Sequence, residues 1–149
     1  MEHDEAQPIF VPPQAGKRLD FRSVTHKLTG QHTGGAYYLF ESCFGPGAGN
    51  RLHVHRRENE VCYVIEGALE VRLAHQTLVL EAGSVAHLPK NIPHALRNPL
   101  ETTSRYLFMA VPAGLDDWFD ALEAAERNGT LDDDLYRQLS LDHGIEWLE

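Results

Sequence analysis

The sequence contains few cysteines, and its apolar runs are short. Cys43 and Cys62 are the two cysteines among 149 residues, too few for a disulfide framework. Apolar stretches such as Val61–Ile65 fall far below the roughly 18 residues of a membrane-spanning helix. The N-terminal residues are acidic and lack the apolar segment of a secretory signal peptide. These absences argue against a membrane protein and favour a reduced, cytoplasmic one.

Positive charge is also scarce. The chain has 13 lysines and arginines against 22 aspartates and glutamates, a net charge of −9. A protein that binds a nucleic-acid backbone needs a basic face, so we expect no nucleic-acid partner. Acidity mainly favours solubility and leaves a small-molecule substrate or ligand open. With 42% hydrophobic and 23% charged residues, the composition is typical of a folded globular domain and excludes a disordered or collagen-like chain.

Short apolar runs separated by glycine, proline and asparagine occupy residues 17–111. Candidate strands span 18–24, 36–44, 51–55, 60–66, 69–74, 77–80, 84–88, 94–97 and 103–111. Regularly spaced short strands predict an all-β sandwich or barrel rather than a repeated strand–helix–strand unit. The polar, proline-containing residues 1–16 are expected to form an extended arm.

The pattern changes from alternation to a helical spacing after residue 111. Leu115, Trp118, Phe119 and Leu122 share one face of a helix, which Asn128-Gly129 should end.

A second short helix is expected over Leu131, Leu135 and Leu139, with Thr130 as its N-cap. Residues 144–149 should return an apolar edge to the core. We assign residues 112–149 to the same domain as the barrel, with both helices packed on the outside of its sheet.

One group of histidines and a glutamate stands out. His53 and His55 are two residues apart in a strand-like run, so both side chains should point to one face. Glu60 has the right parity if the chain turns and returns, and His94 follows about forty residues later. Three imidazoles and a carboxylate suit one divalent first-row transition metal ion, namely Mn, Fe, Co, Ni, Cu or Zn. The alternative is that each is an ordinary hydrogen-bonded residue.

The other histidines have no such spacing. We interpret them as ordinary surface or core residues, and His87 in the middle of a strand remains open between a pocket and solvent. The ordinary group consists of His3, His26, His32, His75 and His143.

The spacing around this group resembles the two motifs of the cupin family. Gly47 is followed by His53, His55, Glu60 and Gly67 with gaps of five, one, four and six residues. Gly83 is followed by Pro89, Asn91, His94 and Asn98 with gaps of five, one, two and three. The family usually has glycine at Asn91, but asparagine also tolerates positive φ, so the turn should survive. We assign structural roles in turns to Gly47, Gly67, Gly83, Pro89 and Asn98.

A wider similarity over residues 17–149 resembles single-domain cupins of the quercetin 2,3-dioxygenase type. It is carried by Thr33–Ala36, His55–Glu60, Tyr63–Gly67, Val111–Gly114 and His143–Glu146. The resemblance implies a double-stranded β-helix, or jelly roll, with a metal ion held by His53, His55, Glu60 and His94. It also implies that Glu60 is catalytic, as a base toward a substrate hydroxyl.

The walls of a pocket beside the metal are predicted by strand parity. Cys62 and Val64 share the face of Glu60, and Leu96 shares the face of His94. Neighbouring strands would add Tyr38 or Phe40 and Tyr106 or Phe108. An apolar lining suits a flat aromatic or enolic substrate. The alternative, that these residues are ordinary core, is equally compatible with the pattern.

Three functions follow from this reading. The first is a metal-dependent dioxygenase, an oxidoreductase acting on a flavonol-like or other enolisable aromatic. The second is a metal-dependent isomerase, cyclase or lyase, and the third is a small-molecule-binding cupin without turnover. The run Val61–Ile65 is apolar on both faces and needs cover on both, from the helices or from a second subunit. We expect a homodimer, with Trp118, Phe119 and the N-terminal arm near its interface.

Overall fold

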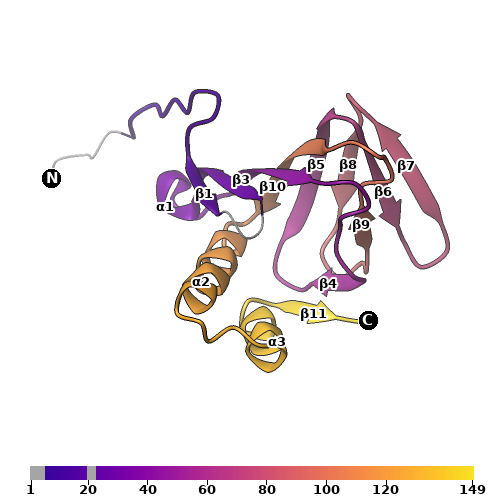
Figure 1. Cartoon of the computed structure of the whole chain (residues 1–149). Helices are drawn as coiled ribbons and strands as arrows, with labels where there is room; N and C mark the ends of the chain where they lie inside the picture. Colours follow the sequence, from indigo (N-terminus) through magenta and orange to yellow (C-terminus); the bar gives the residue numbers. More distant parts are fainter. Residues whose placement is uncertain (1–5, 20–22) are drawn as a thin grey trace, which may run out of the picture.

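The computed structural model describes residues 6–19 and 23–149, which form two larger antiparallel sheets, a two-stranded sheet and a C-terminal helical segment (Figure 1). The larger sheet has the order β1-β2-β3-β10-β5-β8, the smaller one β7-β6-β9, and β11 pairs with β4. The strands are β1 (Lys17–Leu19), β2 (Val24–Leu28), β3 (Tyr38–Phe44), β4 (His53–His55), β5 (Asn59–Glu66), β6 (Ala68–Arg72), β7 (Thr77–Glu81), β8 (Val85–Leu88), β9 (Ala95–Arg97), β10 (Ser104–Val111) and β11 (Ile145–Trp147).

Alternating side chains build the core between the sheets. Every second residue of β10 is buried, and its inward residues face the inward residues of β3 and β5 across the ladders. The inward residues of β6 and β9 belong to the same core cluster. The predicted all-β sandwich is therefore confirmed.

Two turns of the motif region depend on particular residues. Asn91 has φ +67°, as its predicted place in a glycine-type turn requires. Gly67 has φ +81°, and a Cβ there would lie 2.1 Å from Ser104 Oγ, so only glycine fits. Asn98 is fully buried, and its amide nitrogen donates to the carbonyl oxygens of Phe44, Gly45 and Thr102. This side chain ties together the turns that flank β3 and β10.

Several element boundaries differ from the predictions. The expected strand 18–24 is replaced by β1 and by β2, which continues to Leu28, and part of the expected range lies outside the described residues. A short helix, α1 (Gly30–Thr33), occupies a region without a predicted element. The N-cap of α3 (Asp133–Asp142) is Asp132 rather than Thr130, because the Asp132 carboxylate accepts a hydrogen bond from Leu135 N at 2.8 Å.

The C-terminal helices pack differently from the expectation. In α2 (Leu115–Arg127), the buried Phe119 packs against the inward Phe40 of β3 rather than against an outer sheet face, and the buried Trp118 packs against Phe119. α2, α3 and β11 follow one another along the side of the barrel that carries β4 (Figure 1). The returning edge is confirmed, since β11 pairs with β4 and buries Ile145. The C-terminal segment therefore lies beside β4, the strand that carries His53 and His55.

The outer face of β5 is partly open in this chain. Tyr63 is 43% exposed, whereas Cys62 and Val64 on the inner face are fully buried. The homodimer stays a prediction. Trp118 and Phe119, which we expected near its interface, are buried within the chain. Within residues 6–19 and 23–149, no helix has the length and apolar character needed to cross a membrane.

Candidate metal centre

The three motif histidines converge on one point inside the barrel. His53 and His55 lie on β4 and point to one face, as the two-residue spacing predicts. His94 is held opposite them because its backbone N–H and C=O both bond to His53, at 2.9 and 3.1 Å. One ring nitrogen of each histidine lies within 4.8 Å of the others, and all three side chains are buried. The three histidines can therefore bind one metal ion.

Hydrogen bonds on the far side of two rings decide which nitrogens face the centre. Nδ1 of His53 lies 2.7 Å from the carbonyl oxygen of Arg51, which can only accept. Nδ1 of His55 lies 2.6 Å from Oε1 of Glu58, a buried carboxylate. Both Nδ1 atoms therefore carry the proton, and both Nε2 atoms turn a lone pair inward. Histidine ligands of metals are oriented in this way.

The inward atoms form an arrangement that needs a cation. Nε2 of His53 and Nε2 of His55 are 3.2 Å apart. When both rings are neutral with their protons on Nδ1, neither Nε2 atom can donate a hydrogen bond to the other. Oε2 of Glu60 lies 3.3 Å from Nε2 of His55 and 3.3 Å from Nε2 of His94. The buried Nε2 of His94 has no hydrogen-bond partner in the described part of the chain. Facing lone pairs repel unless a proton or a metal ion lies among them, so these donors fit a divalent first-row metal.

Charges within the cluster shift its pKa values in opposite directions. Burial, helped by the neighbouring histidines, lowers the pKa of His53 to about 4. Burial would also lower the pKa of His55, but Glu60 and Glu58 outweigh it and raise that pKa. Burial opposes ionisation of Glu60, but His55 and His94 lower its pKa to about 2. The carboxylates of Glu58 and Glu60 thus favour a positive charge at the cluster, which a bound metal ion would supply.

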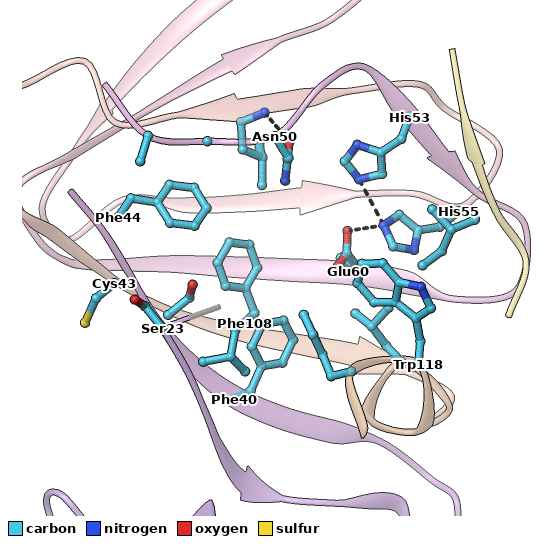
Figure 2. A pocket seen from close by; sticks show the side chains of 18 of the residues that line it. Ser23, Phe40, Cys43, Phe44, Asn50, His53, His55, Glu60, Phe108 and Trp118 are labelled. Atoms are coloured by element: carbon cyan, nitrogen blue, oxygen red, sulfur yellow. Dashed lines mark hydrogen bonds and ion pairs between the residues drawn. The ribbon is translucent and has the colours of Figure 1, made fainter. Parts of the chain in front are cut away.

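A cavity of about 320 Å³ opens beside the cluster (Figure 2). His53, His55 and Glu60 line one end, and Ser23, Cys43 and Phe44 lie at the other.

Aromatic rings make up much of the cavity wall. Of the predicted wall residues, Phe40, Leu96 and Phe108 line the cavity. The others do not line it and are packed in the core, fully buried: Tyr38, Cys62, Val64 and Tyr106. Burial, together with the Glu60 charge, raises the pKa of Cys62 to about 12, so this thiol is neutral and inert. His87 is exposed on β8, where it pairs with the outward Val61, and lies apart from the cluster.

Residues from the C-terminal segment complete the wall and were missed by sequence reasoning. Trp118 of α2, Tyr136 of α3 and Trp147 of β11 line the cavity, and the Trp147 ring lies 4.8 Å from the His53 ring. Ser140 Oγ accepts the indole N–H of both tryptophans, at 3.3 and 3.0 Å, and donates to Tyr136 O at 2.7 Å. The helical spacing around Trp118 was the available signal, but it does not say which surface the helix covers.

Glu58 and His26 also have roles that the sequence did not indicate. Glu58 orients His55, as described above. The ring of the buried His26 bonds to the Tyr38 hydroxyl through Nδ1 and to Asp120 Oδ1 of α2 through Nε2, the latter at 2.9 Å. Lys17 donates to the same Asp120 oxygen at 3.0 Å. These contacts tie α2, and with it part of the cavity wall, to β1 and β2.

Comparison with known proteins identifies the family. A family model described as a cupin domain matches residues 40–110, the segment from β3 to β10 that contains the cluster. This segment is a cupin domain. This cupin resembles a solved RmlC-like cupin from Shewanella frigidimarina NCIMB 400 with 28% identity and a TM-score of 0.50, over 56% of this chain and 72% of that one. The predicted cupin jelly roll is confirmed.

Two relatives of known name indicate candidate activities. Quercetin 2,3-dioxygenase of Bacillus subtilis (strain 168) is 30% identical over 95 residues, which are 62% of this cupin and 28% of that protein. Polyketide synthase CurC of Streptomyces cyaneus is 28% identical over 102 residues, 68% of this cupin and 65% of that protein. The matched segment thus spans less than a third of the dioxygenase and about two thirds of CurC.

Proposed function

We propose that this cupin is a metal-dependent dioxygenase that acts on a flat, enolisable aromatic molecule. The observation that carries the proposal is the buried cluster of three histidines and one carboxylate at the end of an aromatic-lined cavity. Sites with an apolar wall and a few convergent polar groups are typical of small-molecule binding. The match to quercetin 2,3-dioxygenase supports the choice of reaction.

The position of each residue in the cavity suggests its role. His53, His55, His94 and Glu60 would hold the metal ion, which as a Lewis acid supplies charge stabilisation to a coordinating enol or phenol. The Glu60 carboxylate lines the cavity and would accept the proton of the substrate hydroxyl. The tryptophans and phenylalanines would hold the aromatic ring flat and exclude water. Conversion of a bound enol to an enolate makes the ring electron-rich, which oxygenation by dioxygen requires.

A second candidate is a cyclase, isomerase or lyase at the same centre. The match to polyketide synthase CurC favours it, because that match covers more of this chain and of its relative than the dioxygenase match does. In this case Glu60 would move a proton on an enolisable polyketide-like substrate, and no oxygen would be consumed. A binding protein without turnover is the remaining alternative.

Metal content is the first test. Wild type, His94→Ala and His87→Ala are purified together and analysed by ICP-MS; His87 is exposed and outside the cluster, so it provides the matched control. We expect near-stoichiometric first-row metal in wild type and His87→Ala and its loss in His94→Ala. A wild type that stays empty after incubation with Mn, Fe, Co, Ni, Cu and Zn would contradict metal chemistry.

Reaction type is tested next with the metal found. Oxygen uptake against a panel of flavonols and other aromatic enols should be abolished in Glu60→Gln. Substrate conversion without oxygen uptake would favour the second candidate, and binding without conversion would favour the third.

A further inference from the structure

The strand register gives the distance between the metal centre and the far end of the cavity. β3 alternates, so Phe40, Ser42 and Phe44 point inward in succession, and all three line the cavity. Across β10, Ala110 pairs with Glu60 while Tyr106 pairs with Ser42. Ser42 therefore lies four residues along the strands from the row of Glu60, about 14 Å at roughly 3.4 Å per residue. Figure 2 shows the neighbouring Cys43 and Phe44 at the end opposite His53 and His55.

The Ser42 side chain lies in the cavity wall, and its hydroxyl has no partner among the described residues. The residue is 3% exposed, and its side chain has no hydrogen bond to any residue in the ranges 6–19 and 23–149. Its neighbours along the face, Phe40 and Phe44, have no polar side-chain atoms that could serve it. Among the described residues, the side-chain polar atom that is both fully enclosed and unpartnered is Nε2 of His94. The Ser42 oxygen is therefore open to the cavity, where a polar group of a ligand can reach it.

We propose that Ser42 is the hydrogen-bonding subsite for an oxygen substituent at the end of the ligand remote from the metal centre. The inference rests on the proposed function, since it takes the near end of the ligand to be the enol at the cluster. The separation assigns the ligand class: an elongated aromatic of about three linked rings with a hydroxyl or carbonyl at each end. Phe40 and Phe44 flank Ser42 on the inward face of β3, so its hydroxyl offers a hydrogen bond between two apolar side chains.

The test measures binding with three flavones. 3-Hydroxyflavone, 3,7-dihydroxyflavone and 3,4′-dihydroxyflavone share the same chelating edge, and the latter two add a hydroxyl at one far end or the other. Zinc-loaded protein is used under nitrogen, because zinc has no redox chemistry and turnover is avoided. Kd is read from quenching of Trp118 and Trp147, which line the cavity. The proteins are wild type, Ser42→Ala, Ser42→Thr and Ser84→Ala, a control whose serine lies outside the cavity.

In wild type, the dihydroxyflavone whose added hydroxyl reaches Ser42, either the 3,7 or the 3,4′ compound, should bind about tenfold more tightly than 3-hydroxyflavone. This is the effect of one hydrogen bond. Ser42→Ala should lose this preference while its Kd for 3-hydroxyflavone changes less than twofold. Ser42→Thr, which keeps the hydroxyl, and Ser84→Ala should retain the preference. Equal weakening of all three ligands by Ser42→Ala, or no preference in wild type, would overturn the subsite alone. Failure of all three ligands to bind wild type would overturn the proposed substrate class and the subsite with it.

Discussion

Replacement of Glu58 by alanine should weaken metal binding without removing any of the four side chains that face the centre. The Glu58 carboxylate accepts the Nδ1 proton of His55 at 2.6 Å, and both groups are buried. The bond orients the ring and increases the electron density at Nε2. Loss of such a partner typically weakens metal binding 10- to 100-fold, which is about 1.4–2.7 kcal/mol. Because the alanine variant also leaves Nδ1 buried and unpaired, we expect a value near the upper limit, about 100-fold.

Glu58→Gln keeps an acceptor without the charge and should lose about tenfold. Zinc affinity is measured by competition with a chromophoric chelator at pH 8, where protons compete least for His55, whose pKa is raised. Glu66→Gln is the control, since that side chain lies at the end of β5, the strand that follows Glu58, and is 71% exposed. An affinity of Glu58→Ala within twofold of wild type would refute the role of this hydrogen bond.

Three further predictions concern stability, measured by urea unfolding. Ser140→Ala leaves two indole N–H groups without their acceptor and should cost about 2 kcal/mol; a loss below about 0.5 kcal/mol would contradict the bridge. Asn98→Ala breaks a fully satisfied buried amide network and should cost at least about 3 kcal/mol of unfolding free energy. A cost below about 0.5 kcal/mol, typical of a surface substitution, would show that the turns form without this side chain. Partial burial opposes ionisation of Asp120, but hydrogen bonds with His26 and Lys17 lower its pKa below the ordinary 3.8. Its stabilisation is therefore present above pH 3.8 and lost as the pH falls through the lowered pKa. The cost of Asp120→Asn should be about 1 kcal/mol at neutral pH and disappear once the pH is below that lowered pKa. A cost that does not depend on pH would contradict this reasoning.

The strands and the shared face of His53 and His55 were predictable because they depend on the alternation of side chains along a strand. Alternation places His53 and His55 on one face, and this holds wherever β4 lies in the barrel. Asn91 occupies a positive-φ turn because its residue type tolerates that conformation.

Features that depend on depth or on tertiary packing were not predictable. Cys62 shares the face of Glu60 as parity requires, yet it lies where the interior is filled rather than open. The helix that carries Trp118 has an apolar face, but periodicity gives the face and not the surface it covers. His26 looked ordinary because its partners, Tyr38 and Asp120, lie 12 and 94 residues away.

The pair Glu58 and Glu60 shows why motif spacing and structure are both needed. The two carboxylates are two residues apart and both are buried, so parity alone would give them the same role. Glu60 lies in β5 and approaches Nε2 of His55, whereas Glu58 precedes the strand in the turn after β4 and approaches Nδ1 of the same ring. One imidazole is therefore held at both nitrogens by carboxylates of different function, a ligand candidate on the inner side and a positioning group on the outer side. Only the path of the turn, where the β-strand alternation is interrupted, assigns each carboxylate to its side.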